Sequence, residues 1–88
     1  MPTAMVHLLY FARLRESLGT DSERFELPAG VADVDALLQC LRSRGGAWER
    51  ELAPGRPVRA AVNQDMAGPA TPVRDGDEVA FFPPVTGG

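Results

Sequence analysis

Lysine is absent from this 88-residue chain, in which all nine basic residues are arginine. The absence excludes a P-loop, a Schiff-base lysine and a lysine general base. The single cysteine, Cys40, excludes an internal disulfide, and with only one histidine, His7, the chain has too few soft ligands for a zinc site. The sequence therefore predicts a protein with no active site of its own and with no bound metal or cofactor.

Long hydrophobic runs and an excess of positive charge are also missing. No apolar run approaches the ~20 residues that span a bilayer, and the first residues lack the basic and apolar regions of a secretory signal. Twelve acidic residues against nine basic ones give a net charge of −3, which offers no electrostatic footprint for nucleic acid or anionic membranes. We therefore expect a cytoplasmic protein that binds neither of them.

The length and composition are those of one small globular domain. Apolar residues make up 44% of the chain and charged residues 24%, which is ordinary for a folded protein. A chain of this size buries enough surface for one modest core. We expect that core within residues 1–82, followed by a flexible, extended tail over residues 83–88.

Apolar spacing predicts an α+β fold. Strands are indicated by apolar runs or alternation at residues 5–10, 22–27, 58–62 and 79–82. A short helix is predicted at residues 11–18, a longer one at 31–44 and one further helical turn at 47–52. The stretch around Met66 is predicted to be a loop because Gly68, Pro69 and Pro72 follow it.

This order places one main helix on a mixed sheet. A ubiquitin-like β-grasp and a ferredoxin-like split βαβ both fit it. The unequal helix lengths favour the β-grasp, because the ferredoxin-like fold has two comparable helices.

Isolated polar side chains offer no catalytic group. His7 lies in an apolar strand and is interpreted as a packed residue. Cys40 falls on the flank of the apolar stripe of the long helix and is interpreted as an inert thiol. Asp75 and Asp77 flank Gly76, which is typical of a tight turn, and one such cluster lacks the ligands that calcium needs.

The C-terminal tail is the segment with reactive potential. Pro83 and Pro84 fix φ and hold the chain extended, while Gly87 and Gly88 have no side chains, so the tail is thin enough for a narrow channel in a partner. A carboxylate with a pKa of roughly 3.3–3.7 is ionised at neutral pH and is a poor electrophile. It becomes an acyl donor after activation, for which a mixed anhydride with AMP serves, and the ATP chemistry must then belong to a partner. The pattern predicts a protein carrier whose working group is the carboxylate of Gly88.

The C-terminal sequence resembles that of the molybdopterin synthase small-subunit (MoaD) family over residues 75–88 (DGDEVAFFPPVTGG). Residues 10–19 (YFARLRESLG) resemble the strand-to-helix segment near the start of that family, and residues 60–64 (AAVNQ) resemble its central strand. The matches follow the expected order over nearly the whole chain. The resemblance implies a ubiquitin-like β-grasp sulfur carrier.

The resemblance also implies a reaction sequence and partners. A ubiquitin-activating-type adenylyltransferase, using ATP and Mg²⁺, adenylates Gly88, and a sulfur donor converts it to a thiocarboxylate. The tail, formed by Val85, Thr86 and Gly87 after the two prolines, then enters the large subunit of the synthase. There, two sulfur transfers to cyclic pyranopterin monophosphate build the dithiolene of molybdopterin. The family assembly is a heterotetramer with one small subunit at each end.

The family docks on its partners through an apolar patch beside the tail. The matching positions are Phe11, Met66 and Phe82, with Arg15 as a polar neighbour. Core packing is the competing interpretation for all three apolar residues, although the Gly/Pro-rich stretch around Met66 favours an exposed contact there.

Three other functions remain open from the sequence. A sulfur carrier for thiamine or thionucleoside synthesis shares the fold and the Gly-Gly end. A protein modifier that conjugates to lysines is the second, although this chain has no lysine through which to extend its own chains. The third is a plain interaction domain with an unused tail.

Overall fold

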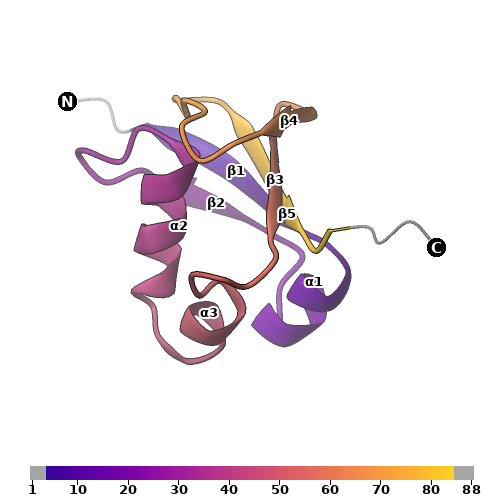
Figure 1. Ribbon diagram of the computed structural model, residues 1–88. Helices are drawn as coiled ribbons and strands as arrows, with labels where there is room; N and C mark the ends of the chain where they lie inside the picture. The colour runs from indigo at the N-terminus through magenta and orange to yellow at the C-terminus, as the bar shows by residue number, and fades with distance from the viewer. Residues whose placement is uncertain (1–3, 85–88) are drawn as a thin grey trace.

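The computed structural model describes residues 4–84 and shows a five-stranded sheet with one helix across a face and two short helices at one end (Figure 1). The elements in chain order are β1 (Met5–Tyr10), α1 (Ala12–Leu18), β2 (Ser22–Glu26), α2 (Val34–Arg42), α3 (Gly46–Glu51), β3 (Arg59–Val62), β4 (Asp65–Ala67) and β5 (Glu78–Phe82).

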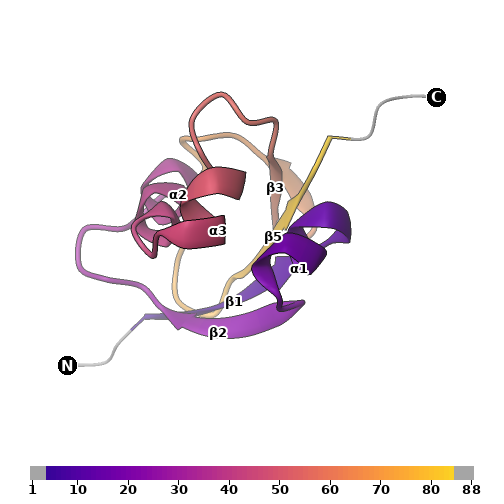
Figure 2. The ribbon, with the colours of Figure 1, turned by 90° about the horizontal axis from the view of Figure 1, so that it is seen from below.

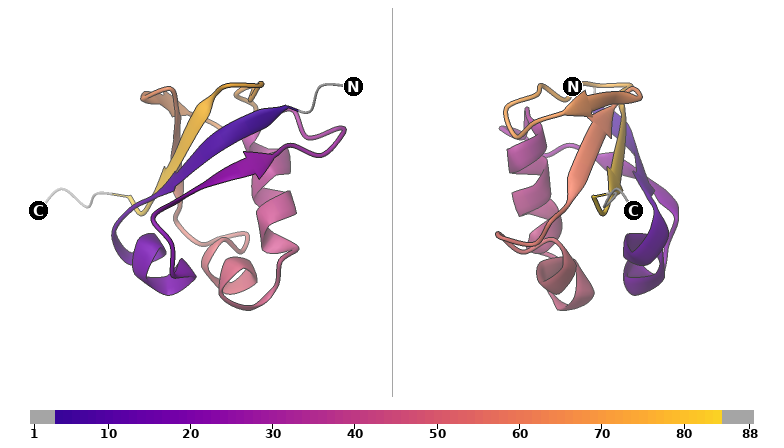
Figure 3. Two further views of the ribbon diagram at one scale, coloured as in Figure 1. Left: turned by 180° about the vertical axis from the view of Figure 1, so that it is seen from behind. Right: turned by 45° about the vertical axis from the view of Figure 1, so that its right-hand side comes forward.

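The sheet is mixed, with the strand order β2-β1-β5-β3-β4. β1 and β5 are parallel neighbours at its centre, and the β1–β2, β3–β5 and β3–β4 pairs are antiparallel. The first and last strands therefore lie side by side, and the chain leaves β5 at the end of the sheet where α1 and α3 lie (Figures 1 and 3). This is the predicted mixed sheet with one main helix.

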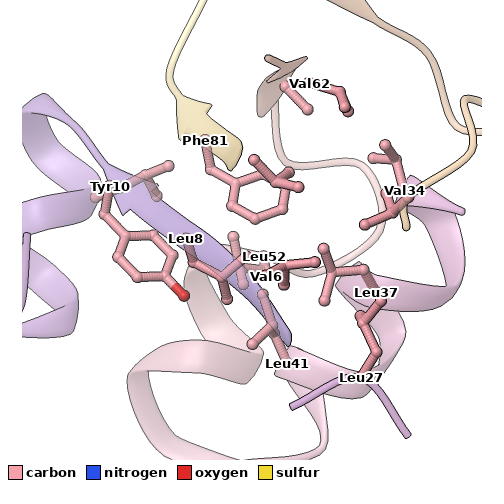
Figure 4. Close-up of a cluster of buried hydrophobic side chains, with 14 residues drawn as sticks. Val6, Leu8, Tyr10, Leu27, Val34, Leu37, Leu41, Leu52, Val62 and Phe81 are labelled. Carbon is pink, nitrogen blue, oxygen red and sulfur yellow. The ribbon is translucent and has the colours of Figure 1, made fainter. Parts of the chain in front are cut away.

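The core lies between the sheet and α2 (Figure 4). Every second residue of β1 points toward the helix, so Val6, Leu8 and Tyr10 are buried. Leu37 and Leu41, one turn apart on α2, are completely buried against them. The other members of the cluster are Leu14, Leu27, Val34, Leu52, Ala60, Val62, Val73, Val79 and Phe81.

The long helix is shorter than the sequence predicts. It begins at Val34 because Asp33 caps it, its Oδ1 accepting a hydrogen bond from the backbone N–H of Ala36 at 2.8 Å. The C-cap residue of α2 is Ser43. Gly45, with a φ of 77°, is the N-cap residue of the next helix, α3. The predicted C-cap Gly19 is confirmed, with a left-handed φ of 76°.

Strand β4 was not predicted. Asn63 and Gln64 have φ values of 51° and 72°, which is the backbone geometry of a two-residue hairpin turn. The turn folds Asp65–Ala67 back onto β3, so Met66 lies in a strand opposite Ala61 and not in a loop. The prediction of a loop around Met66 was wrong because residues 65–67 are too few to show alternation.

A polar cluster ties four segments together beside the core. Arg44 donates two hydrogen bonds to Glu23, both at 2.9 Å, and the Tyr10 hydroxyl donates a third at 2.9 Å. The Arg44 guanidinium also lies over the Trp48 ring, with its Cζ 4.4 Å from the ring centroid. Arg44 holds the pKa of Glu23 below its ordinary value, whereas burial raises the pKa of Tyr10.

None of the helices within residues 4–84 has the length and apolar character needed to cross a bilayer.

Candidate functional site

The outer face of the sheet, opposite α2, carries a continuous apolar row. The strand register aligns Leu9 with Ala80, Ala80 with Ala61, and Ala61 with Met66. Leu9, Ala61 and Ala80 alternate with core residues on their own strands, and Met66 alternates with Ala67, which is half-buried against the core. All four side chains therefore lie on the outer face. Met66 is 65% exposed, whereas Ala61 is buried but lies outside the core cluster.

A second row lies on the same face, closer to the start of the tail. Phe82 is aligned with Arg59, and Phe11 lies on the other side of β5, where its backbone N–H donates to the carbonyl of Phe81 at 3.1 Å. Phe11 has an extended backbone (φ −122°, ψ 157°), so it continues the alternation of β1 and is directed away from the core. The two rows form what we call the apolar patch, made of Leu9, Phe11, Ala61, Met66, Ala80 and Phe82.

The start of α1 fixes the exposure of Phe11. Phe11 is the N-cap residue and is 47% exposed. The next residue, Ala12, has a φ of 53°, a left-handed conformation that alanine rarely adopts. The Phe11 carbonyl accepts from the N–H groups of Leu14 and Arg15, at 3.1 and 3.4 Å. Arg15 is exposed one turn after Phe11, so the predicted polar neighbour lies on the same side of the helix.

The tail begins directly at the edge of this patch. Phe82 ends β5, and Pro83 and Pro84 follow it half-buried. Pro84 borders a shallow hollow between α2 and β3 that Leu38 and Val58 also line. Of the remaining tail residues, Val85, Thr86, Gly87 and Gly88 lie outside the described residues.

The structure brings together the predicted docking residues and adds three that were missed. Phe11, Met66 and Phe82 share the outer face, and the competing interpretation of core packing is wrong for Phe11. Leu9, Ala61 and Ala80 fill the space between them. Their period-two spacing within the strands was visible, but which face alternate residues occupy depends on where α2 packs.

The outer face becomes polar away from the tail. His7 is aligned with Arg24 on β2 and with Glu78 on β5, and it is exposed. The interpretation of His7 as a packed residue was therefore wrong. An apolar strand at the centre of a sheet still has two faces, and His7 falls on the solvent side of β1.

Two other residues that the sequence singled out lie outside the apolar patch. Asp77 has a structural role, and the structure shows no role for Cys40. Asp77 closes a turn with a left-handed Gly76, and its Oδ2 accepts from the N–H of Arg74 at 2.8 Å, as predicted for turn chemistry. Cys40 is a half-buried free thiol. Within residues 4–84, no three His, Cys, Asp or Glu side chains are grouped as metal ligands. The apolar patch beside the start of the tail is the candidate functional site among the described residues.

Comparison with known proteins identifies the family. The sequence profile of the ThiS family matches residues 8–88, almost the whole chain. The chain belongs to the ThiS family. It is 45% identical over 84 residues to the molybdopterin synthase sulfur carrier subunit of Escherichia coli (strain K12), which covers 96% of this chain and 100% of the relative.

Solved structures confirm the β-grasp fold. SAMP1 from Haloferax volcanii is 29% identical, with a TM-score of 0.77 over 97% of this chain and 100% of that one. A complex of subunits 1 and 2 of the molybdopterin-converting factor from Helicobacter pylori 26695 contains a chain that is 27% identical, with a TM-score of 0.60 over 96% of this chain and 99% of that one.

Proposed function

We propose that this chain is the sulfur carrier subunit of a molybdopterin synthase and that the carboxylate of Gly88 is its working group. The observation that carries the proposal is the apolar patch, which adjoins the tail root at Phe82, in a chain 45% identical to a subunit of that name. The similarity to that relative extends over 84 residues, which cover 96% of this chain and 100% of the relative.

The proposed chemistry divides between this chain and its partners. A carboxylate oxygen of Gly88 attacks the α-phosphorus of ATP, bound with Mg²⁺ by an adenylyltransferase, and pyrophosphate leaves. A hydrosulfide equivalent from a sulfur donor then displaces AMP to give the thiocarboxylate. The large subunit receives the tail, and the thiocarboxylate sulfur attacks cyclic pyranopterin monophosphate to form a thioester between Gly88 and the substrate. Water then cleaves the acyl–sulfur bond, which leaves the sulfur on the substrate and returns the carboxylate of Gly88. A thiocarboxylate is a far better nucleophile than a carboxylate, which is the reason for the prior activation.

The apolar patch supplies the docking energy in this scheme. Ordering the six tail residues in a channel costs roughly 1–2 kcal/mol of backbone entropy per residue. Pro83 and Pro84 lower that cost, since their φ angles are already fixed. The folded domain must offset the rest, and exposed Phe11 and Met66 are the large apolar side chains available for it among the described residues.

The proposal is tested at the last residue. Deleting Gly88, or adding one alanine after it, is expected to abolish sulfur transfer while the circular dichroism and unfolding midpoint stay unchanged. Adding one alanine before Met1 is the matched control and is expected to leave transfer intact. Normal molybdopterin formation by either C-terminal variant would refute the carrier role.

A protein modifier is the second candidate. It is favoured because the chain is similar in fold to SAMP1, the small archaeal modifier protein 1 of Haloferax volcanii. Both functions require adenylation of Gly88, so adenylation alone does not separate them. Conjugates between this chain and lysines of other proteins, recovered from cells and absent with the Gly88 deletion, would favour the modifier.

A further inference from the structure

Glu51 draws three arginines together at the end of α3. It is the one buried charged residue among those that the structure describes, with its side chain 9% exposed. Arg56 Nη2 lies 3.1 Å from Glu51 Oε1, Arg50 Nε lies 3.8 Å from Oε2, and Arg13 Nε lies 4.0 Å from Oε1. The arginines come from α1, from α3 and from the segment that follows α3, so the fold and not one helix assembles the cluster.

The cluster carries more positive charge than Glu51 neutralises. One carboxylate balances one guanidinium, and two positive charges are left over. The side chains of Arg13, Arg50 and Arg56 are 57%, 67% and 43% exposed, and each approaches Glu51 through a single nitrogen. A guanidinium has five N–H donors, so within residues 4–84 most donors of the cluster have no protein acceptor. The surplus is local, because the whole chain has a net charge of −3.

Arg13 places one edge of the arginine cluster next to the apolar patch and the start of the tail. α1 and α3 lie side by side at the end of the sheet from which the chain leaves β5 (Figure 2). Phe11, a member of the patch, is hydrogen-bonded to Phe81 and stands two residues before Arg13. A partner that holds the tail and covers the patch therefore has the arginine cluster at the rim of its contact.

We propose that Arg13, Arg50 and Arg56 bind a carboxylate-rich rim on the large subunit that receives the tail, an inference that rests on the proposed function above. The cluster already binds one carboxylate, that of Glu51. Guanidinium groups can pair with carboxylates in a bidentate geometry that lysine lacks. A short row of carboxylates meets only the arginine cluster, whereas the charge of nucleic acid extends beyond the cluster, where the net charge of −3 of the chain opposes binding. Charges at a rim act mainly on the rate of association and on its dependence on salt.

The test uses two variants of equal net charge. Arg13→Gln/Arg50→Gln removes two charges from the cluster and keeps Arg56, the closest partner of Glu51. Arg24→Gln/Arg74→Gln removes two exposed charges elsewhere. Association with the isolated large subunit is measured at low and high salt by surface plasmon resonance. The cluster variant is expected to associate roughly tenfold more slowly at low salt and to show a weaker salt dependence. The control is expected to behave as the wild type.

The outcomes separate this inference from the proposed function. At saturating large subunit, the thiocarboxylated cluster variant is expected to transfer sulfur at the wild-type rate, because the tail is intact. If the two double variants associate with the large subunit equally fast, the inference is wrong while the carrier role stands. The same holds if the cluster variant is impaired only in binding heparin, a polyanion measured in a parallel binding assay. If the wild-type chain neither binds the large subunit nor transfers sulfur to its substrate, the carrier role itself fails.

Discussion

At the scale of single residues, Ala12 has a strained backbone conformation directly after the exposed Phe11. Its φ of 53° turns the chain from the extended Phe11 into α1 without an intervening glycine. A left-handed conformation costs an L-residue roughly 1–2 kcal/mol. The backbone hydrogen bond to Phe81 holds Phe11 beside the end of β5, and the turn at Ala12 starts α1 there while Phe11 stays exposed.

Replacing Ala12 with glycine is therefore expected to be neutral or to stabilise the fold by up to about 1 kcal/mol, since glycine adopts a positive φ without a clash. Ala36→Gly, within α2, is the matched control and is expected to destabilise by about 1 kcal/mol. Urea unfolding measures both. A destabilisation at position 12 equal to that at position 36 would contradict the strained geometry.

Met66 is the most exposed large apolar side chain in the patch. Met66→Asp is expected to weaken binding to the large subunit by roughly tenfold or more, because a carboxylate in an apolar contact loses its hydration. Ala70→Asp adds the same charge at an exposed loop position and serves as the control. Titration calorimetry gives both affinities, and an unchanged affinity for Met66→Asp would remove Met66 from the docking surface.

At the scale of elements, the β3–β4 hairpin positions Met66 through one asparagine. Asn63 Oδ1 accepts from the N–H of Glu78 and its Nδ2 donates to Asp77, both at 3.0 Å. These bonds attach the hairpin turn to the start of β5. The positive φ of Asn63 suits asparagine better than most residues.

Asn63→Ala is expected to lower the free energy of unfolding by about 2 kcal/mol, since it loses both hydrogen bonds and keeps the unfavourable φ. Asn63→Gly loses the same hydrogen bonds, but glycine adopts the positive φ without strain. A smaller decrease in the free energy of unfolding is therefore expected for it. Equal stability of the two variants would show that the turn conformation contributes nothing. Thermal and urea unfolding give the comparison.

Elements with a local signal were predictable from the sequence. The apolar stripe of α2 and the glycine that ends α1 are determined by spacing within one segment. The hairpin strand β4 was not predictable in this way, because a three-residue strand exists only through its pairing with β3.

The candidate site was predicted only in part, because some of its residues come together only through contacts between distant segments. The resemblance gave Phe11, Met66 and Phe82, and the structure places all three on one face. Leu9 and Ala80 required the register across four strands, which no single segment encodes. The arginine cluster was also missed, since Arg13 and Glu51 are far apart in sequence and meet only when α1 packs beside α3.

At the scale of the whole molecule, the cluster around Glu23 joins β1, β2, α3 and the segment between α2 and α3. Arg44 lies over the Trp48 ring while it donates to Glu23, and Tyr10 donates to the same carboxylate. The pKa of Glu23 is lowered mainly by the hydrogen bonds from Arg44. Its contribution to stability is therefore present above the ordinary glutamate pKa and is lost as the pH falls through the lowered value.

Glu23→Gln is expected to remove part of this acid dependence. The wild type should lose more stability between neutral pH and about pH 3 than the variant does. Glu26→Gln, on the same strand, controls for the loss of one carboxylate. Urea unfolding at both pH values measures the difference, and identical pH profiles for wild type and Glu23→Gln would contradict the role of the cluster.

The domain as a whole presents the apolar patch beside the end of β5, and its reactive group is proposed to be the carboxylate of Gly88. Intact-protein mass spectrometry, after incubation with ATP, Mg²⁺, the adenylyltransferase and a sulfur donor, tests this claim most directly. The account predicts a mass increase equal to the replacement of one oxygen by one sulfur, confined to the C-terminal peptide. An unchanged mass, or a sulfur located on Cys40, would contradict it.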